Sequence, residues 1–111
     1  MIARLWSAQT TAAQAPAYVD HLRSQVLPAV RKVDGYVGAL LLERAVPDGV
    51  EILVLTFWRS LDAVRGFAGD DLGRAVVADE AAALLSRFDR EVRHYEVAVR
   101  DDANADGGES R

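Results

Sequence analysis

Apolar residues recur along this chain at two spacings, and the spacing separates helical segments from strands. The first helical segment carries an apolar stripe with steps of three and four residues, formed by Tyr18, Leu22, Val26, Val30 and Val33. Thr11 and Gln14 have the spacing of a capping box before this stripe. Pro28 interrupts the stripe, so we expect a kink or a split near Leu27. Gly35 follows the last turn, where a left-handed residue commonly ends a helix.

Four segments have the length and the residue types of strands: 2–8, 36–44, 51–58 and 91–99. Turn residues at 47–49 join the second and third segments into a hairpin. Ser60 is placed to cap a second helix. Residues 70–89 have a helical composition, but Gly73 and the turn-like residues 78–80 predict a short helix, a break and another short helix. The order strand, helix, strand, strand, helix, strand predicts a ferredoxin-like α+β fold, with a four-stranded, mainly antiparallel sheet and both helices on one face.

The third strand segment is apolar on both of its faces. One face carries Ile52, Val54, Thr56 and Trp58, and the other carries Leu53, Leu55 and Phe57. Helices of this fold cover only one face of the sheet, and the chain has no further element for the second face. We therefore predict a homodimer in which two sheets pack face to face.

Composition narrows the class of protein. Half of the residues are hydrophobic and none is cysteine, which indicates a folded domain without disulfides, thiolate chemistry or cysteine-bound metal. No apolar run approaches the ~20 residues of a membrane-spanning helix, and the first residues lack the pattern of a signal peptide. We expect a soluble, cytoplasmic protein that does not bind membranes.

The net charge of −4 is concentrated at one end of the chain, because residues 101–111 hold four acidic residues and one basic residue. The other 100 residues carry 13 acidic and 12 basic side chains, so they offer no basic excess for nucleic acid. We predict one ordered domain over residues 1–99 and a disordered acidic tail over residues 100–111.

Three segments, "MIARLW", "LTFWRSLDAVRGFAGDD" and "RHYEVAV", resemble the antibiotic biosynthesis monooxygenase family of the dimeric α+β barrel superfamily. The likeness spans residues 1–99. It implies a ferredoxin-like protomer, a barrel-like dimer, and a ligand cavity between each sheet and its own helices. Some members oxidise polycyclic phenolic compounds with molecular oxygen and no cofactor, others bind and degrade haem, and many have no assigned activity.

The haem-degrading branch of this family has a tryptophan near the end of the third strand, which Trp58 matches. It also uses an asparagine on the first strand and a histidine on the second helix. Neither is present here, since the one asparagine is Asn104 and residues 61–69 contain no histidine. Haem degradation is therefore disfavoured, and we expect neither a cofactor nor a metal.

Trp58 and His94 are the leading candidates for a site. Trp58 ends the third strand, either as a core anchor or as a cavity wall that stacks on a flat ligand. Phe67 joins it at the junction between this strand and the next helix. His94 lies in the last strand, where a histidine is more often structural, and the functional alternative is a general base.

Four further residues complete the predicted ligand-binding set. Arg4 and Trp6 share one face of the first strand, either as a stacked pair in the cavity or as a pair at its rim. His21 borders the apolar stripe and Tyr36 opens the second strand, so each is placed for the cavity or for an ordinary structural role. We expect a monooxygenase-like protein that binds, and on the enzymatic interpretation oxidises, a flat apolar or phenolic molecule. The alternative is a non-enzymatic ligand-binding or stress-associated dimer.

Overall fold

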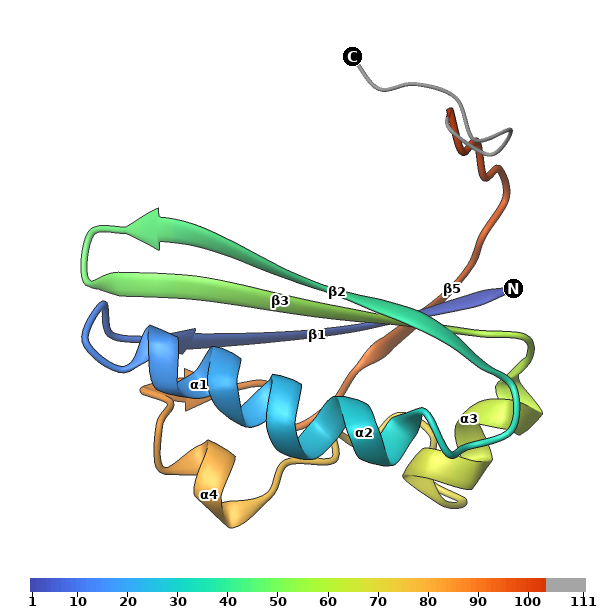
Figure 1. The fold of residues 1–111 in the computed structure, drawn as a ribbon, viewed down its shortest axis with the longest axis horizontal. Helices are drawn as coiled ribbons and strands as arrows, with labels where there is room; N and C mark the ends of the chain where they lie inside the picture. The colour runs from blue at the N-terminus through green and yellow to red at the C-terminus, as the bar shows by residue number, and fades with distance from the viewer. Residues whose placement is uncertain (104–111) are drawn as a thin grey trace.

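The strands form one antiparallel sheet, and the helices lie against one of its faces (Figure 1). The structure is a computed structural model that describes residues 1–103. The elements are β1 (Ile2–Thr10), α1 (Ala15–His21), a π-helical turn η1 (Leu22–Val26), α2 (Leu27–Val30), β2 (Tyr36–Val46), β3 (Gly49–Trp58), α3 (Leu61–Ala68), α4 (Asp79–Ala82), β4 (Arg87–Phe88) and β5 (Arg93–Glu96). No helix within residues 1–103 is long and apolar enough to cross a membrane. Most of the predicted tail, residues 104–111, lies outside the described residues.

The predicted ferredoxin-like α+β fold is confirmed, with a correction to its last strand. The strand order is β2-β3-β1-β4, and β5 also pairs with β1, so the sheet has five strands rather than four. The expected strand over 91–99 is shortened to β5, which starts at Arg93 because the preceding backbone bonds elsewhere: the Ala75 N–H donates to Arg90 O and the Val92 N–H donates to Gly73 O. Backbone groups of residues 90–92 therefore pair with residues 73–75 and leave the edge of β1.

The first helical run follows the predicted stripe and is distorted where proline predicts it. Pro28 lacks an N–H and its ring crowds the preceding turn, and the helix widens into the π-helical turn η1 directly before it. The run is continuous from α1 through η1 to α2. At its start, the Gln14 N–H donates to Thr11 Oγ1 over 3.1 Å, which is half of the expected capping box.

The segment after α3 differs from the prediction of two short helices. Ser60 caps α3 as expected, with its side chain accepting from the Ala63 N–H over 3.1 Å, and Gly69 ends the helix. Residues 69–78 then form no helix, and only α4 follows. The cause is tertiary, since backbone groups in this segment bond to residues 90–92 and to the Arg4 side chain.

The two faces of β3 have different environments. The predicted inner face, formed by Ile52, Val54, Thr56 and Trp58, is buried beneath the helices. The opposite face carries half-buried apolar side chains, and its neighbours on β2, Leu40 and Leu42, are 52% and 45% exposed. The register places Leu40 opposite Leu55 and Leu42 opposite Leu53, so the exposed face is continuous across two strands. We call this surface the open sheet face.

A glycine in a left-handed conformation holds the start of β2 against α3. Gly35 has φ +91°, and a Cβ there would overlap Ala63 Cβ. Gly69 also has a positive φ, +79°, but nothing lies near its missing Cβ. We expect Gly69→Ala to lower the free energy of unfolding by about 1 kcal/mol through backbone strain, and Gly35→Ala to lower it by about 2 kcal/mol or more. Urea unfolding of both variants checks this, and equal losses would contradict the role of the Ala63 contact.

Candidate ligand-binding site

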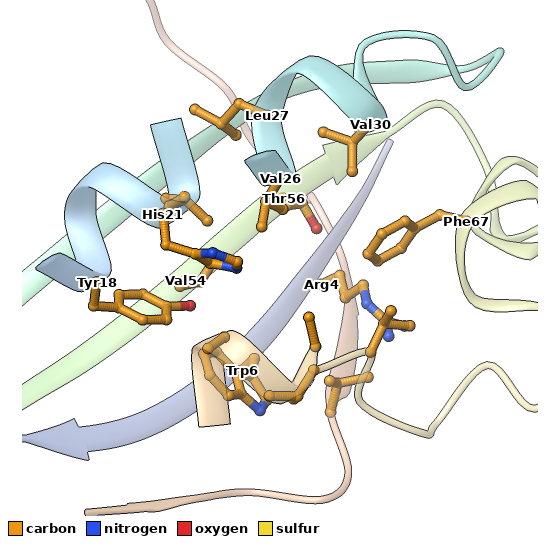
Figure 2. A pocket seen from close by; sticks show the side chains of 16 residues that line it. Arg4, Trp6, Tyr18, His21, Val26, Leu27, Val30, Val54, Thr56 and Phe67 are labelled. Atoms are coloured by element: carbon orange, nitrogen blue, oxygen red, sulfur yellow. The ribbon is translucent and has the colours of Figure 1, made fainter. Parts of the chain in front are cut away.

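A cavity of about 80 Å³ lies between the inner face of the sheet and the helices. Its wall is mostly apolar and comes from β1, β3, the first helical run, α3 and the irregular residues 76–78. Figure 2 shows two groups of polar and aromatic side chains at its ends, with Arg4 and Phe67 at one end and Tyr18 and His21 at the other. The cavity is thus an apolar space with a different polar group at each end.

Arg4 is the most unusual residue of the site because it is charged and only 4% exposed. Its Nη1 donates to Leu72 O over 2.7 Å and lies 3.0 Å from His94 Nε2, and its Nη2 donates to Arg74 O over 2.9 Å. The guanidinium carbon lies 5.6 Å from the centre of the Phe67 ring. Burial lowers the pKa of Arg4, but a guanidinium remains protonated at physiological pH.

His94 lies directly opposite Arg4 in the register of β1 and β5, and it does not line the cavity. Arginine has no acceptor, so the His94 Nε2 atom accepts from Arg4 and the ring proton resides on Nδ1. Burial, followed by the charge of Arg4, lowers the pKa of His94. The imidazole is therefore neutral near pH 7, with its basic nitrogen directed at Arg4.

Thr56 extends this polar row to the other side of Arg4. The register pairs Arg4 with Thr56 on β3, and both side chains line the cavity. Trp58 is fully buried, donates its indole N–H to Thr56 Oγ1 over 2.9 Å, and stacks on Phe67 at 5.7 Å. Tyr36 meets Trp58 edge to face at 5.4 Å. Trp58 and Tyr36 thus lie behind the cavity wall, in the core.

The far end of the cavity holds two groups from the first helical run. Tyr18 is 4% exposed, and burial raises the pKa of its hydroxyl to about 12, so the phenol stays protonated. His21 packs near it with ring centres 6.2 Å apart. The His21 Nε2 atom is buried without a hydrogen-bond partner among residues 1–103. An unsatisfied buried nitrogen is costly, so a ligand or water in the cavity would stabilise it.

Trp6 lines the cavity between these ends, but it does not stack on Arg4. Its indole N–H donates to Asp89 O over 2.7 Å, and its ring lies 6.3 Å from Tyr18 and 6.2 Å from Phe88. The aromatic partner of Arg4 is instead Phe67.

The structure brings four of the predicted residues to the cavity wall, Arg4, Trp6, His21 and Phe67. It places Trp58, Tyr36 and His94 outside the wall, so any role of these three in binding or catalysis would be indirect. Thr56 was not among the predicted site residues, although a single hydroxyl on an apolar strand face is a visible signal. The wall residues 76–78 were not predicted either, because no local sequence signal marks them.

The residues and the volume of the cavity determine whether it can hold a metal ion or a haem. No group of three or more His, Asp or Glu side chains within residues 1–103 is arranged to hold a metal ion. His21 offers an imidazole nitrogen to the cavity, but about 80 Å³ does not accommodate a porphyrin. The residues and the space around them therefore do not fit a haem.

His94 is expected to make stability depend on pH. The unfolded histidine titrates near its ordinary pKa of 6.5 and the folded one below it, so the unfolded chain binds more protons between these values. The free energy of unfolding should therefore fall as the pH drops through 6.5, and its full value should be present above that pH. Thermal unfolding at pH 7.5 and 5.5 measures this loss. His94→Gln, which keeps an acceptor for Arg4, should lose less, and an equal loss would contradict the assignment.

Comparison with known proteins supports the fold. No family model and no curated protein matches the chain. A candidate antibiotic biosynthesis monooxygenase from Bacillus cereus has a TM-score of 0.67 at 17% identity, covering 93% of this chain and 96% of that one. The haem degrader MhuD from Mycobacterium tuberculosis, with two haems in its active site, has a TM-score of 0.58 at 17% identity, covering 92% of this chain and 100% of that one.

A monooxygenase from Streptomyces coelicolor in complex with nanaomycin D is also similar, with a TM-score of 0.57 at 16% identity, covering 91% of this chain and 92% of that one. At identities this low, the likeness extends to the fold alone. The chain therefore has the ferredoxin-like fold of the antibiotic biosynthesis monooxygenases, as the resemblance in its sequence predicted.

Proposed function

We propose that this protein binds a small, flat, mostly apolar phenolic molecule and oxidises it with molecular oxygen without a cofactor. The observation that carries the proposal is the apolar cavity between sheet and helices, with a buried cation at one end and an unpartnered imidazole at the other. Such a cavity has the general character of a small-molecule site, in which a few polar groups orient an apolar ligand. The Streptomyces coelicolor monooxygenase of this fold is in complex with nanaomycin D, which supports an organic small molecule as the ligand.

The proposed reaction needs a base and a group that stabilises an anion. A base takes a proton from the substrate, and the resulting enolate or phenolate transfers an electron to oxygen before a carbon–oxygen bond forms. Loss of water from the peroxide then leaves a carbonyl at the ring carbon that had carried one C–H bond. The hydrogens of that C–H bond and of the phenol O–H end in water, with one oxygen atom of O2 in the product and the other in the water. Arg4 supplies a positive charge in the cavity wall, which favours the anionic form of the substrate.

The two histidines are alternative bases. The sequence-based hypothesis assigned the base to His94, whose Nε2 atom accepts from Arg4. His21 has a buried, unpartnered Nε2 atom and lines the cavity directly. A base must reach the proton that it removes, so we propose that His21 accepts the proton and that His94 fixes the orientation of Arg4.

The size of the cavity limits the substrate. About 80 Å³ is well below the ~300–1,000 Å³ of sites for drug-sized ligands, so a single ring fits better than a polycyclic molecule. A larger ligand requires the wall to move, and residues 76–78 and Val92 are the parts of the wall without regular secondary structure. Single-ring phenols are therefore the first substrates to test.

Oxygen uptake with single-ring and polycyclic phenols tests the activity. We expect uptake above the protein-free background, and a loss of about 100-fold or more in His21→Gln. Arg23→Gln, on the exposed side of the same helical run, is the matched control and should keep the parent rate. A large loss confined to His94→Gln would instead support His94 as the base. Uptake at the background rate contradicts the oxygenase proposal, and retained ligand binding would then identify a non-enzymatic binding protein.

We further propose that the protein is a homodimer that buries the open sheet face. Leu40 and Leu42 are about half exposed in the single chain, and Leu53, Leu55 and Phe57 continue the apolar surface beside them. Contiguous apolar surface on a folded protein favours association, and a two-fold axis would bring this face onto its copy.

Leu55→Lys should convert the dimer to a monomer, because each protomer would have to bury an ammonium group in an apolar interface. Light scattering coupled to size-exclusion chromatography measures the mass. Leu61→Lys, on the half-exposed first residue of α3, is the control and should remain dimeric. A monomeric parent protein at micromolar concentration would overturn the proposed assembly.

A further inference from the structure

The charge of Arg4 is not neutralised by any carboxylate that the structure describes. The ion pairs formed within residues 1–103 do not include Arg4, and no Asp or Glu is among the residues that line the cavity. Its described polar partners are two backbone carbonyls and a neutral imidazole. A buried guanidinium with only neutral partners is a positive centre that attracts an anion.

The hydrogen bonds of Arg4 leave part of the guanidinium available. Of five N–H groups, two on Nη1 are directed to Leu72 O and His94, and one on Nη2 is directed to Arg74 O. The Nε–H and one Nη2–H have no acceptor within residues 1–103. Two guanidinium N–H groups that remain free can donate to the two oxygens of a carboxylate.

Thr56 supplies another donor on the strand next to Arg4. Its Oγ1 atom accepts from the Trp58 indole, so the Thr56 O–H is left to donate, and Thr56 lines the cavity opposite Arg4 in the strand register. Because Trp58 is fully buried, the Thr56 side chain is held in one orientation. Trp58 is thus a positioning residue that acts through Thr56.

We infer that the cavity is specific for an aromatic carboxylate with a single ring, whose carboxylate binds Arg4 and Thr56 and whose ring lies against the apolar wall. This inference rests on the proposed function only in that the cavity binds a small molecule, and it names the class of that molecule. The ring would extend from the Arg4 end, beside Phe67, towards His21 (Figure 2). A hydroxyl on the far side of such a ring would satisfy the His21 Nε2 atom.

Calorimetric titration of the full chain with benzoate, benzamide and phenol tests the inference. Benzoate and benzamide have nearly the same shape and differ in charge. We expect benzoate to bind about 10- to 100-fold more tightly than benzamide, since a charge-assisted pair on Arg4 is replaced by neutral hydrogen bonds. Arg4→Met should remove this preference, Arg4→Lys should keep part of it, and Thr56→Val should reduce it severalfold.

Arg59→Met is the matched control, because Arg59 is largely exposed and distant from the cavity wall, and it should keep the parent preference. If Arg4→Met does not fold, Arg4→Lys and Thr56→Val decide the question, since Thr→Val preserves side-chain shape. Equal binding of benzoate and benzamide by the parent protein, or a preference that stays at the parent value in the Arg4 and Thr56 variants, overturns the inference. Tight phenol binding with no benzoate preference overturns it while leaving the proposed function intact. Benzoate preference without oxygen uptake overturns only the oxidation, and binding of no probe overturns both.

Discussion

The hydrogen bonds of Arg4 connect parts of the molecule that are far apart in the sequence. A guanidinium that is almost fully enclosed needs acceptors for its donors, and Arg4 finds three of them in the carbonyls of Leu72 and Arg74 and in His94. These bonds join β1 to the irregular segment after α3 and to β5. The segment therefore stays over the sheet, and its residues 76–78 close the cavity.

The sheet divides the molecule into two surfaces with separate roles. The inner face carries the core and the cavity, with the polar row of Thr56, Arg4 and His94 crossing three strands between apolar rows. The open sheet face carries apolar side chains that no helix covers. Because the side chains of a strand alternate between faces, a change on one face leaves the chemistry of the other largely untouched. The proposed assembly and the proposed ligand binding could thus change independently.

Local rules predicted the parts of the fold that depend on local physics. Ser60 caps α3 with its hydroxyl, Gly35 adopts a positive φ that its missing Cβ permits, and a widened helical turn precedes Pro28, which lacks an N–H. The shortening of the last strand was not predictable in this way, because the backbone groups of residues 90–92 bond to a segment about 17 residues earlier. In the site, strand alternation put Arg4 and Trp6 on one shared face, but it did not show that this face lines the cavity. It did not show that His94 would be the partner of Arg4 rather than a base open to the cavity.

The two tryptophans of the chain occupy different surroundings, and this makes them separate optical reporters. Trp6 forms part of the cavity wall, whereas Trp58 is enclosed in the core behind it. A molecule that enters the cavity would touch the first indole and leave the second in the same solvent-free environment. The emission of a Trp58→Phe protein would then follow occupancy, and that of a Trp6→Phe protein would follow the integrity of the core.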